Sequence, residues 1–94
     1  MAKLLIDGPN GAQVAFPIIG VEILIGRMDS TDLVLEDPAV SRVHAKIVKE
    51  TDGQVIVDLE SRVGTRVNGE LIRKHKLRDG DIIEIATARL EYRE

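Results

Sequence analysis

The chain contains no cysteine and no tryptophan, and it has one phenylalanine and one tyrosine among 94 residues. Without cysteine, disulfides and thiolate metal sites are excluded, which is compatible with a reducing compartment and leads us to expect a cytoplasmic protein. The scarcity of aromatic side chains argues against a stacking platform for single-stranded nucleic acid. The core must therefore be built from isoleucine, leucine and valine.

Long apolar runs and a strong net charge are also missing. No segment approaches the length needed to span a bilayer, and no signal-peptide pattern follows Met1. The formal net charge of −3 argues against diffuse binding to DNA or to an acidic membrane. We therefore expect neither nucleic acid nor membrane as a partner. A chain of this length is expected to form a single domain over residues 1–94.

The charges are unevenly distributed along the chain. Residues 61–78 carry six basic side chains and one acidic side chain, whereas residues 1–40 carry two basic and six acidic ones. A basic segment is often only a solvated face. This one begins with SRVGTRVNG, residues 61–69, in which the Asn-Gly pair indicates a hairpin turn and valine and threonine favour a strand. The arginines have no such architectural explanation.

Short apolar segments separated by turn signals follow one another through the whole sequence. Asn-Gly, Asp-Gly and the Gly-Pro-Asn-Gly run at residues 8–11 recur at spacings of about ten residues, a pattern typical of an all-β sandwich or barrel. Apolar and polar residues alternate in ARLEYR (88–93), as in a half-buried strand. The continuous runs ILI (23–25) and VIV (55–57) predict strands buried on both faces.

Catalytic chemistry finds little support in the sequence. Only His44 and His75 can act as bases near neutral pH. Ser41, His44 and Asp58 could be combined into a Ser-His-Asp set, but no glycine-flanked nucleophile turn accompanies them. The acidic residues between positions 29 and 37 lack the spacing of a calcium loop, and no phosphate-cradling Gly-Lys-Ser/Thr loop occurs. We therefore expect no enzymatic activity, no cofactor and no metal site.

Polar residues fall where three of the expected strands end or begin. Arg27 follows VEILI, Ser41 and Arg42 precede HAKIVK, and Arg62 follows VIVDL. Arginine offers a fork of donors to phosphate oxygens, and a serine hydroxyl adds a neutral donor. Solvated strand ends would explain the same residues, so the spacing alone leaves both interpretations open.

Several short motifs occur in a fixed order: Gly26-Arg27, Ser41-Arg42-x-His44, Gly64-Thr65, Asn68-Gly69 and Gly80-Asp81. With them, the chain from about Ile23 to its C-terminus resembles the forkhead-associated (FHA) domain, a phosphothreonine-peptide-binding module. The resemblance implies an eleven-stranded, antiparallel-type β-sandwich with the peptide site in loops at one end. Such domains often form one end of a larger protein. We therefore also expect that residues 1–94 can be one domain of a longer chain.

The resemblance implies a role for each matched residue. Arg27 would contact the phosphate or the flanking peptide, Ser41 would hydrogen-bond the phosphate through its hydroxyl, and Arg42 occupies a position that often reaches the phosphate. Arg62 would add positive charge beside the phosphate. Two interpretations of Arg66 stay open: it adds charge there as well, or it is a solvated strand residue. The implied structural supports are Gly26, His44 (buried beneath the site), Gly64, Thr65 and Asn68, the last stabilising its hairpin.

One position departs from the family pattern. Most members read Ser-x-Asn-Gly-Thr where this chain has SRVGT, so that Val63 replaces an asparagine that hydrogen-bonds the peptide main chain. Valine has no polar side-chain atom, and losing one hydrogen bond costs about 0.5–1.5 kcal/mol, up to roughly tenfold in affinity. Two functions therefore remain open: a weakened reader of a phosphothreonine-containing protein, or a divergent domain for phosphate-independent protein–protein interaction or self-association. The sequence does not define the oligomeric state.

Overall fold

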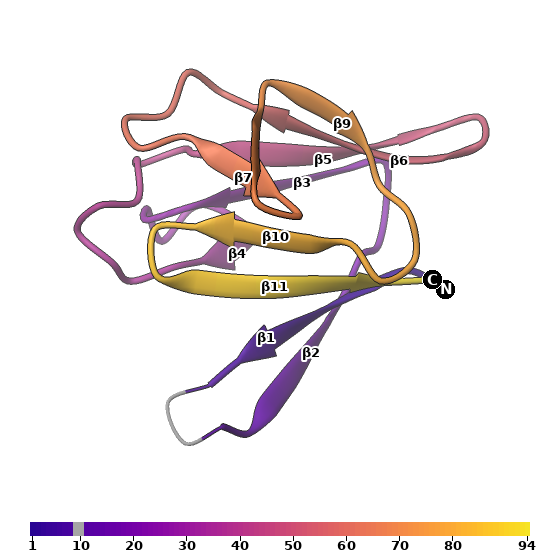
Figure 1. The fold of residues 1–94 in the computed structure, drawn as a ribbon, viewed down its shortest axis with the longest axis horizontal. Helices are drawn as coiled ribbons and strands as arrows, with labels where there is room; N and C mark the ends of the chain where they lie inside the picture. The colour runs from indigo at the N-terminus through magenta and orange to yellow at the C-terminus, as the bar shows by residue number, and fades with distance from the viewer. Residues whose placement is uncertain (9–10) are drawn as a thin grey trace.

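The computed structural model describes residues 1–8 and 11–94, which form eleven strands in two sheets and contain no helix (Figure 1). The predicted eleven-stranded β-sandwich is therefore confirmed. The first predicted turn, at residues 8–11, lies partly outside the described residues. The six-stranded sheet has the order β2-β1-β11-β10-β7-β8, with strands β1 (Lys3–Asp7), β2 (Gln13–Pro17), β7 (Thr65–Val67), β8 (Glu70–Ile72), β10 (Ile82–Ile85) and β11 (Ala88–Arg93).

The five-stranded sheet has the order β4-β3-β5-β6-β9, with strands β3 (Glu22–Gly26), β4 (Leu33–Val34), β5 (Ala45–Glu50), β6 (Gly53–Asp58) and β9 (Lys74–Lys76). Neighbouring strands run antiparallel except β3 and β4, which pair in parallel through Ile25 opposite Leu33 and Gly26 opposite Val34. Parallel neighbours require a crossover between them. Here the crossover is the 27–32 segment, which returns the chain to the same end of the sheet.

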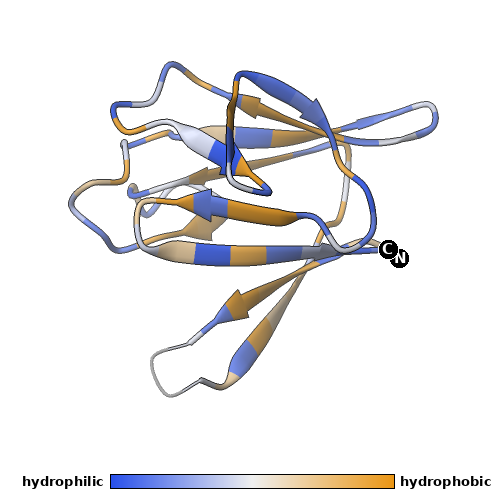
Figure 2. Cartoon of the chain, in the orientation of Figure 1, coloured by the Kyte–Doolittle hydropathy of each residue, from blue (hydrophilic) through white to orange (hydrophobic). Residues whose placement is uncertain are grey.

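The core lies between the facing sides of the two sheets and is almost entirely aliphatic, as the composition requires. Alternation in β11 places Leu90 and Tyr92 inside with no exposed surface, while Arg89 and Arg93 face solvent. The largest fully buried aliphatic side chains are Leu4, Ile25, Ile47, Ile56, Ile83, Ile85 and Leu90. Figure 2 shows the corresponding apolar stretches along the strands and hydrophilic residues over most of the connecting loops.

The prediction that ILI and VIV are buried on both faces is only partly correct. Ile23, Ile25 and Ile56 point into the core, but Leu24 and Val57 lie on the outer face of the five-stranded sheet and are half-buried. A sandwich has two layers, so no third layer covers that outer face, although Val55 on the same face is buried. No helix of the described residues has the length and apolar character needed to cross a membrane.

The arrangement of the strands gathers several connections at one end of the sandwich. Four of them join β3 to β4, β4 to β5, β6 to β7 and β10 to β11, and these lie at the left of Figure 1, opposite the two chain termini. Three of these connections contain the polar residues that the sequence placed at strand ends. The candidate site is therefore at this end.

Candidate functional site

Backbone hydrogen bonds join the first two loops of this end. The Arg27 amide donates to the Ser41 carbonyl oxygen at 3.0 Å, and the Met28 amide donates to the Arg42 carbonyl oxygen at 3.1 Å. Gly26 has to be a glycine here, because a Cβ atom at this position would collide with the carbonyl oxygen of Arg42. The β3–β4 and β4–β5 loops can thus approach each other this closely because residue 26 has no side chain.

Arg27 and Arg62 approach the same loop segment, residues 38–41, from two different loops. Arg27 Nε donates to the Val40 carbonyl oxygen at 3.0 Å, and Arg62 Nη2 lies 3.5 Å from the Pro38 carbonyl oxygen. Binding through Nε leaves both terminal nitrogens of the Arg27 guanidinium free to donate to a ligand. The Arg42 side chain is also exposed at this loop.

Ser41 lies between these two arginines. Its hydroxyl oxygen accepts a hydrogen bond from the Arg62 amide at 2.9 Å. Because an accepted bond uses a lone pair and leaves the hydroxyl proton free, Ser41 can still donate to an anion. Within the described residues, none of Arg27, Arg42 and Arg62 forms an ion pair with a carboxylate. Three guanidinium groups and a free hydroxyl donor therefore remain available to an anionic ligand at this end.

His44 lies beneath the loops with no exposed surface and connects two of them. The Ser41 amide donates to its Nδ1 at 3.1 Å, and its Nε2 lies 2.8 Å from the Gly64 carbonyl oxygen. An amide only donates and a carbonyl only accepts, so the ring is the neutral tautomer protonated on Nε2. The expectation of a buried scaffold histidine thus agrees with this geometry.

The same contacts do not assemble a Ser-His-Asp set. Ser41 meets the histidine ring through its amide and not through its hydroxyl, and the Asp58 carboxylate stays 4.0 Å from an Nε2 that already donates to Gly64. A buried ring with both nitrogens bonded to backbone groups cannot transfer a proton to a substrate.

Asp58 fixes the conformation of the third loop, a role that the sequence analysis missed. One carboxylate oxygen accepts from the Ser61 and Thr65 hydroxyls at 2.5 and 2.7 Å, and the other accepts from the Ser61 amide at 3.1 Å. The Ser61 hydroxyl in turn accepts from the Gly64 amide at 3.0 Å. An aspartate at a strand end with serine three residues later is a signal for such a turn, and it could have identified Asp58.

Asp37 makes a second connection that the sequence did not reveal. Its carboxylate accepts from the Ala39 amide at 2.9 Å and from the Thr87 hydroxyl at 2.7 Å. The contact with Thr87 joins the β4–β5 loop to the β10–β11 turn, 50 positions further along the chain. It holds the start of the 38–41 segment that both arginines contact. No local pattern could indicate a contact over that separation.

These carboxylates make the stability of the domain dependent on acid pH. Burial alone would raise the pKa of Asp58, but hydrogen bonds from Ser61 and Thr65 hold it below the ordinary value of 3.8. The pKa of Asp37 is lowered by its bonds with Thr87 and Ala39. Because a lowered pKa stabilises the fold only while the group is ionised, the contribution is complete above about pH 4 and is lost as the pH falls through the folded-state values.

We therefore expect the free energy of unfolding, measured by urea denaturation, to be constant near neutral pH and to fall steeply below about pH 4. The Asp58→Asn variant is expected to be less stable at neutral pH and to show a shallower acid decline, since one titrating group is gone. An unchanged free energy of unfolding across the acid range in the wild type would contradict this linkage.

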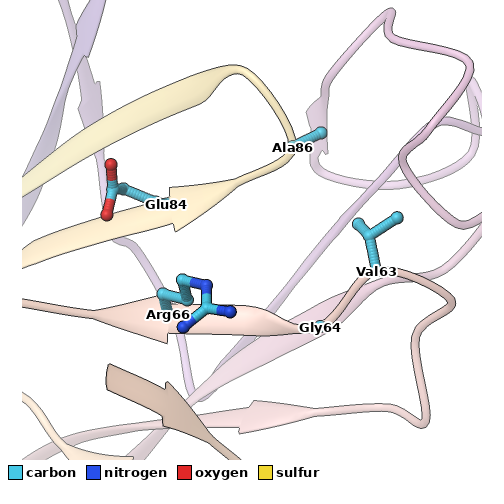
Figure 3. Close-up of a pocket in the computed structure, with 5 residues that line it drawn as sticks. All are labelled: Val63, Gly64, Arg66, Glu84 and Ala86. Atoms are coloured by element: carbon cyan, nitrogen blue, oxygen red, sulfur yellow. The ribbon is translucent and has the colours of Figure 1, made fainter. Parts of the chain in front are cut away.

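Val63 and Gly64 lie between two hollows at the tip of the third loop. One pocket of about 180 Å³ is lined by Val63, Gly64, Arg66, Glu84 and Ala86, and Figure 3 shows Val63 and Ala86 at its loop end and Arg66 and Glu84 on the strands. Val63 is 44% exposed. An asparagine at this position would therefore have its amide accessible to a bound peptide.

Arg66 belongs to a different feature of the surface. It lies opposite Glu84, Glu84 lies opposite Arg89, and Arg89 forms an ion pair with Asp7 at 3.2 Å. These residues form a row of alternating charge across the outer face of the six-stranded sheet. The interpretation of Arg66 as a solvated strand residue is consistent with this row.

The two remaining predicted supports differ in position. Thr65 is buried and donates its hydroxyl to Asp58, so it does stabilise the third loop. Asn68 lies at the other end of β7, where its amide donates to Asp81 at 2.9 Å and its amide oxygen accepts from the Ile82 amide at 2.9 Å. It stabilises the β7–β8 turn, as predicted for its hairpin, but its contacts connect this turn to β10 and not to the arginine loops.

Fold and site together define a class: a β-sandwich with arginine-bearing loops at one end that are held by a buried histidine. The family model described as FHA domain matches residues 23–86. The chain therefore belongs to the FHA domain family, as the sequence motifs predicted.

The similarity to this chain spans only part of the length of each named relative. The transcriptional regulatory protein EmbR of Mycobacterium tuberculosis is 42% identical over 71 residues, which is 74% of this chain and 18% of EmbR. The oxoglutarate dehydrogenase inhibitor of Corynebacterium jeikeium is 39% identical over 85 residues, 90% of this chain and 58% of that protein.

Solved structures show the same architecture over nearly the whole chain. The FhaA FHA domain complexed with the intracellular domain of Rv3910 has a TM-score of 0.89 and 28% identity, with 99% of this chain and 100% of that chain covered. Mycobacterium tuberculosis EmbR in complex with a low affinity phosphopeptide has a TM-score of 0.87 and 33% identity, with 97% and 24% covered.

Proposed function

We propose that this chain is a non-enzymatic recognition module that binds phosphothreonine-containing partners through the loops at one end of the sandwich. The observation that carries the proposal is that two arginine side chains reach the 38–41 segment, in which the Ser41 hydroxyl keeps a free proton. A phosphothreonine carries about −1.5 to −2 charges at neutral pH and three acceptor oxygens. Charged donors and a neutral hydroxyl match that chemistry.

Each site residue then has a distinct task. The Arg27 and Arg62 guanidinium groups neutralise the phosphate, the Ser41 hydroxyl donates a directed hydrogen bond, and Arg42 adds charge at the open side of the loop. Val63 contacts the ligand by apolar contact alone. These side chains bind a formed phosphate ester, and the His44 ring, with both nitrogens occupied, does not act as a base toward it.

Relatives support the choice of ligand. EmbR has been solved with a phosphopeptide, and the FhaA domain with the intracellular domain of another protein. A sequence belonging to the same family is expected to bind a partner of the same chemical kind. Within a longer protein, the domain would attach that protein to its phosphorylated partner.

The proposal is tested by titrating a degenerate phosphothreonine peptide library, and its unphosphorylated counterpart, against the wild type and a Val63→Asn variant. We expect binding of the phosphorylated library only, with amide shift changes in the loops around Arg27, Ser41 and Arg62. The asparagine restores one hydrogen bond to the peptide, worth about 0.5–1.5 kcal/mol, so the variant should bind roughly twofold to tenfold tighter.

Two results would count against the proposal. Equal binding of phosphorylated and unphosphorylated peptides would mean that the loop arginines do not read the phosphate. Absence of binding by both the wild type and Val63→Asn would favour the alternative of a phosphate-independent or self-associating domain, which sedimentation at increasing protein concentration would then examine.

A further inference from the structure

The basic segment of residues 61–78 supplies more positive charge than the phosphate site uses. Among its six cations, only Lys76 forms an ion pair within the described residues, with Asp52 at 2.6 Å. Arg73 is exposed at the corner between β8 and β9. Its carbonyl oxygen accepts from the Asp58 amide at 2.8 Å, which fixes this corner against the end of β6, where the third loop begins.

A pocket of about 270 Å³ lies between that corner and the third loop. It is on the other side of Val63 and Gly64 from the pocket of Figure 3, and its lining residues are Asp58, Ser61, Arg62, Val63, Gly64, Leu71, Ile72 and Arg73. Leu71 packs against Gly64 so closely that a Cβ at Gly64 would collide with its Cδ1 atom, and Gly64 also needs its φ of 87°. Leu71 is nevertheless 62% exposed, so the pocket offers an apolar wall to a ligand.

The lining of this pocket carries a net positive charge, with two arginines against one carboxylate. Asp58 is its one acidic lining residue, and its carboxylate oxygens already accept three hydrogen bonds, from the Ser61 hydroxyl and amide and the Thr65 hydroxyl. Within the described residues, neither Arg62 nor Arg73 forms an ion pair. Two guanidinium-bearing residues thus border a hollow that has an apolar wall.

We propose that this pocket is a second subsite that takes an anionic side chain of the same phosphopeptide, next to the phosphothreonine. An apolar wall with arginines at the rim suits a short aliphatic stem that ends in a carboxylate or a phosphoryl group. Arg62 and Val63 belong to both sites, so an anion held here lies beside the phosphate and on one ligand. This inference rests on the proposed function. Arg73 is the residue that gives the subsite its specificity for an anion.

The test is a set of peptides with one phosphothreonine and a neutral background, in which glutamate is placed in turn at each flanking position. A parallel set carries a second phosphothreonine in place of glutamate, which distinguishes a carboxylate from a phosphoryl ligand. Dissociation constants are measured for the wild type, Arg73→Ala and Lys74→Ala. Lys74 is the matched control: it carries the same charge one position away, but it pairs opposite Val57 on the outer face of the five-stranded sheet.

We expect one flanking position at which the added negative charge tightens binding to the wild type by about twofold to fivefold, the range of an exposed charged pair. That gain should disappear in Arg73→Ala and persist in Lys74→Ala, while the neutral peptide binds all three proteins with similar affinity. A larger gain with the second phosphothreonine would identify a phosphoryl group as the preferred occupant, and a larger gain with glutamate a carboxylate.

Two outcomes would overturn the subsite. Either no flanking position gains affinity from a negative charge, or the gain falls equally in Arg73→Ala and Lys74→Ala, as a diffuse positive field would produce. In both cases the neutral phosphopeptide would still bind, which separates failure of this inference from failure of the proposed function, where no phosphopeptide binds at all.

Discussion

Replacing Arg27 by alanine is expected to remove most of the affinity of this domain for a phosphothreonine peptide. The guanidinium reaches the 38–41 segment through Nε and keeps its terminal nitrogens for the ligand. A hydrogen bond to a charged group contributes about 1.5–3 kcal/mol, so losing one of them should raise the dissociation constant roughly 10- to 150-fold. Calorimetric titration of the wild type and the variant with one phosphopeptide measures the effect.

The matched control for that variant is Arg78→Ala. Arg78 is equally exposed and lies in the β9–β10 connection, toward the end of the sandwich that holds the termini (Figure 1). Its removal changes the net charge by the same amount, so it should weaken binding less than about twofold at physiological salt, where distant charges are screened. Both variants should unfold at nearly the wild-type temperature. Equal losses of affinity in the two variants would contradict a local phosphate site.

Replacing His44 by alanine is expected to destabilise the whole domain. The side chain has no exposed surface, and its removal leaves a cavity and two unpartnered backbone groups, the Ser41 amide and the Gly64 carbonyl. Together these effects should cost about 3–5 kcal/mol, a large part of the stability of a small domain. Urea denaturation of the wild type and the variant provides the comparison.

His75→Ala is the natural control, because the chain has only these two histidines. The His75 side chain is 34% exposed and makes one contact, with Asp81 at 3.2 Å. Its loss should cost about 1 kcal/mol or less. If His44→Ala proves unable to fold, His44→Asn, whose amide can partner one of the two backbone groups, should recover part of the stability. Similar effects of His44→Ala and His75→Ala would show that His44 does not hold the loops together.

Local patterns in the sequence were sufficient to predict most of the fold. Strands such as β5, β6 and β11 have alternating or continuous apolar residues between turn signals, and burial of those residues drives their pairing. Two strands were not apparent in this way. The sequences of β8 (ELI) and β9 (KHK) are too short and too polar to show an alternation of apolar and polar residues. These strands form because β7 and β6 offer them backbone hydrogen-bonding edges.

The site was predicted less completely than the fold. The ordered motifs identified Arg27 and Ser41, and the strand ends also identified Arg62. In the structure both arginines contact the 38–41 segment, which contains Ser41. Asp37 remained hidden because its partner Thr87 is 50 positions away, and a contact over such a distance depends on how the two sheets face each other.

The sequence by itself determined the all-β architecture, the aliphatic core, the family and the replacement of the family asparagine by Val63, because each of these follows from residue type and local order. Only the tertiary structure decided what the basic segment does. Folding directs Arg62 toward Ser41, places Arg66 in a charged row on the outer sheet face, and sets Arg73 beside a pocket. Arginines that are neighbours in sequence thus acquire different surroundings, since each depends on strands that pair from distant parts of the chain.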